Sequence, residues 1–224
     1  ALTRSMYEGL AKGLNDAAGD FGIRAVVLTS EGDHFTAGND IMDFMNNPPT
    51  SDDSEVAQFL AALLNFPKPL IGAVKGNAVG VGTTMLLHCD VVIAGPTAKF
   101  SMPFASLGLV PEAGSSYLFP QLVGYQRAAR IFMTGESFDT ESAIEMGLVT
   151  ANDPDPLAHA RYFQSARSMG LEEDQLLKIC KRALRIFLLG LSLSFFSKIH
   201  AGDFTLVVRL IAMAAATVAF LGDY

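Results

Sequence analysis

One carboxylate, that of Glu112, stands in a stretch with almost no charge. Between residues 100 and 128, the only other charged side chain is that of Arg127. A carboxyl group in apolar surroundings has a raised pKa, because burial disfavours its charged form. A pKa near neutrality suits a general base, so Glu112 is a candidate for moving a proton. An acid that complements the dipole of a helix beginning near Ser115 is an alternative interpretation.

Two glycine-containing turns could present backbone N–H groups to a substrate that reacts with such a base. Ala-Gly-Asn-Asp at residues 37–40 comes after an expected buried strand, and Gly-Val-Gly at residues 80–82 opens an expected helix. The start of a helix presents N–H groups that have no partner within the helix. Two such turns side by side could hold the negative oxygen of a reacting carbonyl group, as an oxyanion hole. Either turn alone could contain glycine only because the chain bends tightly there.

Several other kinds of site are excluded by the sequence. The four histidines and two cysteines lack zinc-ligand spacing, and there is no Gly-x-Ser-x-Gly nucleophile elbow. The glycines at residues 76–82 fit neither a phosphate-binding P-loop nor a dinucleotide fingerprint. With 16 Lys and Arg against 23 Asp and Glu, the net charge is −7, which argues against nucleic-acid binding. Two cysteines in 224 residues also exclude a disulfide-rich secreted module.

The elements that must position these residues alternate between strands and helices. Apolar, β-branched runs predict strands at residues 25–29, 70–74, 91–94 and 99–101. The chain is expected to open inside a helix, with Leu2, Met6, Leu10 and Leu14 forming one apolar stripe. Further helices are expected at residues 55–64, 82–89, 115–122, 126–133 and 140–146, the last with Asp139 as its N-cap and Gly147 as its end. This alternation predicts an α/β layer architecture.

The clearest linker is Asn-Asp-Pro-Asp-Pro at residues 152–156. We therefore expect a core domain at residues 1–155 and a C-terminal helical segment at residues 156–224. Residues 186–197 and 210–222 are uncharged, but each run is too short to cross a bilayer and is expected to be a buried or subunit-facing helix. No signal peptide is visible at the start of the sequence, so a cytoplasmic location without a membrane span is expected.

Four blocks of the sequence resemble, in order and at family spacing, the crotonase (enoyl-CoA hydratase/isomerase) superfamily. Residues 23–41 are similar to its first signature and residues 66–90 to its second, and residues 100–114 and 143–149 match later blocks. The resemblance covers about residues 1–150. It implies a crotonase-like ββα spiral core, an acyl-CoA thioester substrate, no metal or redox cofactor, and a homotrimer or dimer of trimers. The two strands that usually precede the first helix of this family are missing from the sequence.

The resemblance also implies roles for individual residues. The backbone N–H groups of Asn39 and Val81 would form the oxyanion hole, and Glu112 would be the catalytic base. Hydratases of the family use two glutamates, and their positions correspond here to Thr84 and about Ser106. The residues expected to line the substrate side are Ala37, Asp40, Ile41, Gly80, Thr84 and Pro111.

One segment favours isomerisation over hydration. Residues 111–116, Pro-Glu-Ala-Gly-Ser-Ser, resemble the Pro-Glu-Gly-x-Ser-Ser stretch of Δ3,Δ2-enoyl-CoA isomerases, whose glutamate is the single base. Moving a double bond needs one acid/base group, whereas hydration favours two. The resemblance therefore implies Δ3-to-Δ2 enoyl-CoA isomerisation. An enoyl-CoA hydratase that uses Glu112 with water, and a catalytically silent acyl-CoA-binding subunit, remain alternatives.

Overall fold

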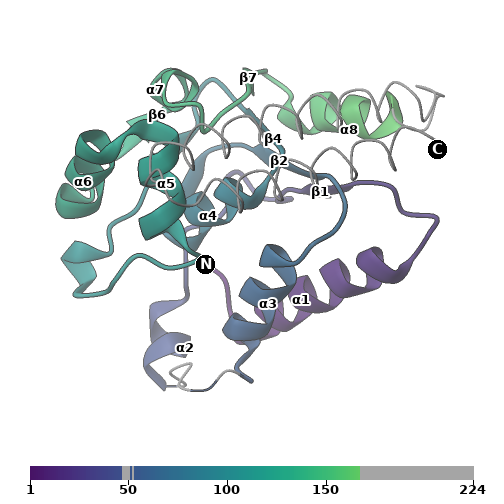
Figure 1. Ribbon diagram of the computed structural model, residues 1–224, viewed down its shortest axis with the longest axis horizontal. Coiled ribbons are helices and arrows are strands. Elements are labelled where there is room, and N and C mark those ends of the chain that lie inside the picture. The colour runs from purple at the N-terminus through teal and green to yellow at the C-terminus, as the bar shows by residue number, and fades with distance from the viewer. Residues whose placement is uncertain (47–50, 52, 167–224) are drawn as a thin grey trace, which may run out of the picture. The chain divides into compact units, whose positions relative to one another are not determined.

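A four-stranded parallel sheet lies at the centre of the computed structural model, which describes residues 1–46, 51 and 53–166 (Figure 1). Its strand order is β1-β2-β4-β7. A smaller sheet, with the order β3-β5-β6, pairs β3 with β5 in parallel and β5 with β6 in antiparallel fashion. The strands are β1 (Val26–Leu28), β2 (Leu70–Val74), β3 (Asn77–Val79), β4 (Val91–Ala94), β5 (Lys99–Ser101), β6 (Phe138–Asp139) and β7 (Ala151–Asn152).

Helices follow or precede nearly every strand, which confirms the predicted α/β architecture. The α-helices of the described residues are α1 (Arg4–Gly19), α2 (Ile41–Asn46), α3 (Glu55–Leu64), α4 (Val81–Thr84), α5 (Ser115–Val123), α6 (Tyr125–Thr134), α7 (Thr140–Glu145) and α8 (Pro156–Ala166). Two 3-10 helices, η1 (Met85–His88) and η2 (Ala105–Leu107), complete the set. The predicted capping of α7 is confirmed, since the side chain of Asp139 accepts a hydrogen bond from Ser142 N–H at 3.0 Å.

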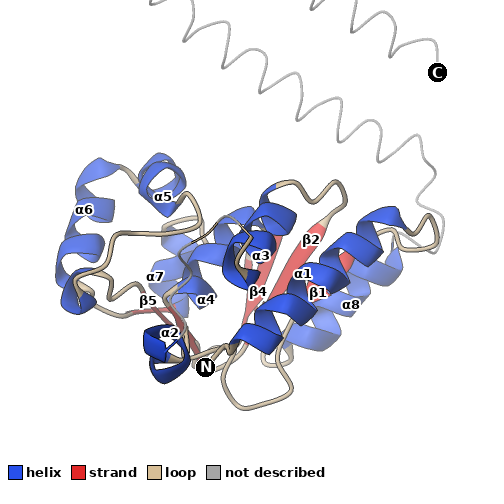
Figure 2. Cartoon of the chain, turned by 90° about the horizontal axis from the view of Figure 1, so that it is seen from below, coloured by secondary structure: helices blue, strands red, loops and turns tan. Residues whose placement is uncertain are grey.

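The central sheet is covered on both faces, as its continuous apolar strands predict. Alternate side chains of β2 point to opposite faces, because successive residues of a strand alternate. Ile71 and Ala73 pack with Ala160 of α8, whereas Leu70 and Val74 belong to the larger core on the other face. Figures 1 and 2 show α8 on one side of β1, β2 and β4, and α1 and α3 side by side on the other.

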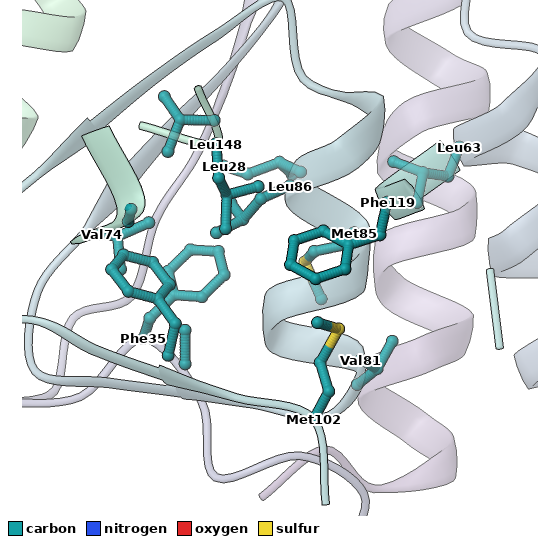
Figure 3. Close-up of a cluster of buried hydrophobic side chains, with 14 of the residues drawn as sticks. Leu28, Phe35, Leu63, Val74, Val81, Met85, Leu86, Met102, Phe119 and Leu148 are labelled. Atoms are coloured by element: carbon teal, nitrogen blue, oxygen red, sulfur yellow. The ribbon is translucent and has the colours of Figure 1, made fainter. Parts of the chain in front are cut away.

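The larger core surrounds the α4–η1 segment. Figure 3 shows Val81, Met85 and Leu86 among buried side chains from several elements, including Phe35, Phe119 and Met102. Each of the three α4–η1 side chains is at most 4% exposed. Because this segment follows one of the two glycine turns directly, the packing of the core fixes the position of that turn.

The expected stripe on the first helix is confirmed at Leu14, which is buried, and at Leu10, which packs against the core, but it is wrong at Met6. Helix α1 begins at Arg4, and Leu2 instead forms an isolated parallel bridge with Asn39. The side of α1 that is buried consists of Tyr7, Ala11, Leu14 and Ala17, while Met6 is 47% exposed. Large aliphatic residues mark the buried side poorly in this helix, because α3 packs so closely against it that a tyrosine and two alanines occupy most of that side.

The sequence also fails to predict several of the shortest elements. Strands β3, β6 and β7 and helices α2 and η2 span two to six residues each. Runs of this length hold too few residues for a repeating apolar pattern to be seen. Among them, β3 leads directly into α4, so its pairing with β5 helps to set where that helix begins.

The C-terminal part of the expected architecture lies largely outside the described residues. Helix α8 packs on the central sheet, and the compact unit to which it belongs spans residues 1–169. The uncharged segments at residues 186–197 and 210–222 fall outside the described part, and the domain boundary near residue 155 stays a prediction. Within the described parts of residues 1–166, the structure contains no helix with the length and apolar character that crossing a bilayer would require.

The turn at Gly76 gives a test of how tightly these elements fit. Gly76 has φ +57°, and a Cβ atom there would lie 2.2 Å from the carbonyl oxygen of Asp33. Gly76→Ala should therefore lower the free energy of unfolding by about 2–5 kcal/mol. This value adds the cost of a left-handed backbone at an alanine to the cost of the overpacked contact. Gly108→Ala is the matched control, because φ is +66° there with nothing within 4 Å of the added Cβ. Urea unfolding of both variants measures the difference, and equal losses would contradict the clash at Gly76.

Candidate active site

A mostly apolar cavity of about 460 Å³ contains two of the residues singled out from the sequence, Asn39 and Glu112. Glu112 is the only ionisable group among the described residues that line it. The apolar part of the lining comes from α2, α3 and the loop before α5. Its members are Phe44, Val56, Ala57, Leu60, Phe104, Leu109 and Val110, with Ser51 and Ser54 as the remaining polar residues.

The Glu112 carboxyl group is held in these surroundings with little polar contact. Burial raises the pKa of Glu112 from its ordinary 4.5 to about 7. The hydroxyl group of Thr84 lies 3.5 Å from Oε1 of Glu112 and opposes this rise, since a donor favours the carboxylate. A raised pKa confirms the expectation for an acid in an apolar stretch.

The backbone reverses sharply straight after Glu112. Ala113 has φ +51° and Gly114 has φ +67°, and Ala113 is the only non-glycine residue with a positive φ in the described part of the chain. The amide of Ser115 donates to the Glu112 carbonyl at 2.9 Å, and the amide of Leu118 donates to that of Gly114 at 2.9 Å. This turn starts α5 while Glu112, its first residue, keeps its side chain at the cavity.

Asn39 is fixed on both its backbone and its side chain. Two hydrogen bonds form the bridge to Leu2. The amide of Leu2 donates to the Gly38 carbonyl oxygen at 2.7 Å, and the amide of Asp40 donates to the Leu2 carbonyl oxygen at 2.9 Å. In a parallel bridge of this kind, the N–H of the middle residue, Asn39, points away from its partner strand. The buried hydroxyl of Tyr7 donates to Oδ1 of Asn39. Burial raises the pKa of Tyr7, and the nearby Glu112 carboxylate adds to the rise.

Val81 begins α4, and its side chain is 1% exposed in the core shown in Figure 3. Gly80 precedes it with φ +56°, and the carbonyl of Gly80 accepts from the amides of Thr83 and Thr84 at 2.9 and 3.0 Å. The N–H of Val81 belongs to the first turn, where no carbonyl within the helix is available to it. Its position therefore satisfies one requirement of an oxyanion donor.

The two turns lie side by side because their preceding residues are paired. Thr36 and Ala78 form a parallel bridge, and Asn39 and Val81 each follow three residues after it. A Cβ atom at Gly38 would lie 3.0 Å from the Val79 carbonyl oxygen, so the backbones of the two segments approach closely. The structure thus brings together the two segments and Glu112 that the sequence singled out separately.

Other residues expected at the site do other things in the structure. Asp40 caps α2, because its Oδ1 accepts from the amides of Met42 and Asp43 at 3.1 and 3.0 Å. Ile41 is the first residue of α2 and is 58% exposed. Ala37 lines a different cavity, near the start of α1. Whether these three residues contact a substrate stays a prediction.

Two of the remaining expected residues are neighbours of Glu112. Pro111 precedes it in the chain and is partly buried, and Thr84 is fully buried beside the carboxyl group. Gly80 is the residue before α4. Ser106 lies in η2 and is exposed. The sequence did not single out Tyr7, which contacts Asn39, or His88, whose ring contacts the residue after Glu112. No local pattern in the sequence indicates either contact.

Comparison with known proteins identifies what this arrangement is similar to. Residues 1–187 match the family model described as enoyl-CoA hydratase/isomerase. Human enoyl-CoA delta isomerase 2 is 32% identical over 192 residues, which are 83% of this chain and 48% of the human protein. The 2,3-dehydroadipyl-CoA hydratase of Escherichia coli strain K12 is 35% identical over 187 residues, 83% of this chain and 73% of that protein.

The chain is also similar to solved structures. The structure of Pseudomonas aeruginosa OdaA has a TM-score of 0.75 and 44% sequence identity, and the match covers 83% of this chain and 76% of that one. The chain spans about half to three-fifths of the length of several curated relatives, among them the human isomerase.

The raised pKa of Glu112 makes stability depend on pH in a defined direction. Between pH 4.5 and 7 the folded state binds more protons than the unfolded state, so stability falls as pH rises through this window. Glu112→Gln removes this ionisation. At pH 8 the variant should be more stable than the parent by about 3 kcal/mol, and the difference should shrink towards zero near pH 4.5.

Denaturant unfolding of both proteins at several pH values measures this difference. Glu136→Gln is the control, because Glu136 forms an exposed ion pair with Arg130 at 2.8 Å and should change stability little at any pH. A pH-independent difference between Glu112→Gln and the parent would show that the carboxyl group is not desolvated.

Proposed function

The chain belongs to the enoyl-CoA hydratase/isomerase family, and from this we propose that it isomerises an enoyl-CoA thioester from the Δ3 to the Δ2 form with Glu112 as the base. The observation that carries the proposal is a single ionisable group among the described lining residues, with a pKa of about 7, in a mostly apolar cavity. Near neutral pH such a group is present both as base and as acid, so it can remove a proton and return it.

The proposed reaction needs one proton to move between two carbons. The Glu112 carboxylate removes a proton from C2, and the electrons of that bond form an enolate that extends over the thioester oxygen. The carboxylic acid then returns the proton to C4, and the double bond ends between C2 and C3. Because the same group gives back what it took, no water is consumed and no second acid/base residue is required.

The enolate oxygen needs donors that are in place before the reaction. The backbone N–H groups of Asn39 and Val81 are the proposed oxyanion hole, on the two adjacent turns. Removing one donor of this kind costs roughly 3–4 kcal/mol of transition-state stabilisation. Asn39 is held by the hydrogen bond from Tyr7, and Val81 is held by its packing in the core. Little reorganisation is therefore needed when the charge forms.

The apolar lining of the cavity supports an acyl chain as the bound group. Side chains from α2, α3 and the loop before α5 offer hydrocarbon contact next to the base. A double-bond shift involves neither electron transfer nor hydrolysis, so no metal or redox cofactor belongs to the proposal. The homotrimer or dimer of trimers expected from the sequence also stays a prediction, since the apolar run at residues 210–222 lies outside the described residues.

Product analysis with separate 3-enoyl-CoA and 2-enoyl-CoA tests the proposal. The parent should convert 3-enoyl-CoA to 2-enoyl-CoA, and Glu112→Gln should lower the rate by about 10²–10⁴-fold, the usual contribution of a general base. Glu136→Gln, which makes the same chemical change on the surface, should keep the parent rate. An unchanged rate in Glu112→Gln, or a 3-hydroxyacyl-CoA as the main product of the parent, would contradict a single-base isomerase.

Hydration is the second candidate, because relatives of this chain include proteins named as hydratases. Thr84 occupies the position of one hydratase glutamate and lies against Glu112. Thr84→Glu should raise hydration of 2-enoyl-CoA relative to isomerisation, and Thr84→Gln, of similar size but uncharged, should not. Two neighbouring carboxyl groups in an apolar cavity should also lower the melting temperature and titrate as a coupled pair. Strong hydration by the parent itself would favour this candidate over isomerisation.

A further inference from the structure

His88 contacts the backbone of the residue that follows the proposed base. Its Nε2 atom lies 2.8 Å from the carbonyl oxygen of Ala113, and the ring is partly buried at the end of η1. A carbonyl oxygen can only accept, so Nε2 carries the hydrogen in this contact.

The carbonyl group that His88 holds belongs to a strained residue. Ala113 adopts φ +51°, a left-handed conformation that is unfavourable for an L-residue with a Cβ atom. Such a conformation persists only where its surroundings hold it. Released from its contacts, the turn would relax towards a right-handed or extended backbone and would carry the Glu112 side chain with it.

One short segment connects the turn to the rest of the proposed site. Residues 81–88, which form α4 and η1, begin with the N–H of Val81 and include Thr84, whose hydroxyl is 3.5 Å from Oε1 of Glu112. They end with the ring of His88 on the Ala113 carbonyl. The segment itself is anchored in the core by the apolar side chains of α4 and η1. It therefore contacts the base residue at its side chain and, through His88, holds the backbone next to it.

Resting on the proposed function, we propose that His88 is a positioning residue, which holds the strained turn after Glu112 and so sets the base at a fixed distance from the oxyanion hole. The ring does not touch the carboxyl group or a reacting atom. It acts through the Ala113 carbonyl, and its effect is to keep the carboxyl group of Glu112 inside the apolar cavity rather than in water. Among the described residues, the other titratable group close to this carboxyl is the hydroxyl of Tyr7 on α1.

Three variants of the full chain separate positioning from general stability. His88→Leu removes the donor, and His88→Gln keeps an amide donor near the position of Nε2. His159→Leu is the matched control. His159 lies on α8, away from the cavity, and its Nδ1 atom is 2.9 Å from a carboxylate oxygen of Asp153. If His88→Leu does not fold, His88→Asn replaces it, since its amide is polar but too short to reach Ala113.

The first measurement is the pKa of Glu112, followed by ¹³C NMR of labelled glutamate carboxyl groups and assigned with Glu112→Gln. His88→Leu should move this pKa from about 7 towards 4.5, because a freed turn lets water reach the carboxylate. His88→Gln should keep the parent value. This titration needs no substrate, so it reports on His88 even if the protein proves inactive on enoyl-CoA thioesters.

The second measurement is the isomerase rate on 3-enoyl-CoA. His88→Leu should lower kcat by about tenfold or more while KM changes little, because the displaced group is the base and not the acyl-binding lining. The pH dependence of kcat/KM should shift down together with the NMR pKa. An unchanged pKa and kcat in His88→Leu would overturn the proposal, and so would an equal shift in His159→Leu or a failure of His88→Gln to restore either value. The activity of Glu112→Gln tests the proposed function and does not test the role of His88.

Discussion

The close parallel approach of two backbone segments, residues 36–39 and 78–82, is the constraint on which the proposed site depends. The bridge between Thr36 and Ala78 sets the register, and glycine makes the approach possible on both sides. A Cβ atom at Gly82 would lie 2.4 Å from Cγ2 of Thr36, and one at Gly38 would lie 3.0 Å from the Val79 carbonyl oxygen. Two N–H groups can converge on one substrate oxygen only where two backbones come this close.

Two local costs are concentrated in the short loop that faces these segments. Ionising Glu112 in an apolar cavity is unfavourable, and the left-handed backbone of Ala113 adds strain at the next residue. The α4–η1 segment, which is anchored by buried side chains, contacts this loop through Thr84 and His88. The stability of the core is therefore used to keep one carboxyl group where it is easily protonated and deprotonated.

Sequence reasoning succeeded best where a signal extends over several residues. The strands at residues 70–74 and 91–94 and the helix at residues 55–64 have the predicted bounds, because each shows one continuous pattern, and the short strand at residues 99–101 has its predicted bounds as well. Glu112 is identifiable because its surroundings lack charge over almost thirty residues. The contacts of Tyr7 and His88 could not be predicted, since both join residues far apart in the chain, one through a side-chain amide and the other through a backbone carbonyl. Which residues of α1 are buried also depends on a partner, α3, that no local pattern reveals.

The two faces of the central sheet are covered by separate groups of side chains, and this has a consequence for how the sequence can diverge. The proposed site and the larger core lie on the face of α1 and α3, whereas α8 contacts the opposite face through Ala160, which is fully buried near Ile71 and Ile93. Position 160 can accept only a small side chain without lifting the helix from the sheet. Most other residues of α8 are at least partly exposed. Substitutions can therefore accumulate at the exposed positions of α8 with little effect on the chemistry, as long as position 160 remains small and position 157, which packs beside it, remains apolar.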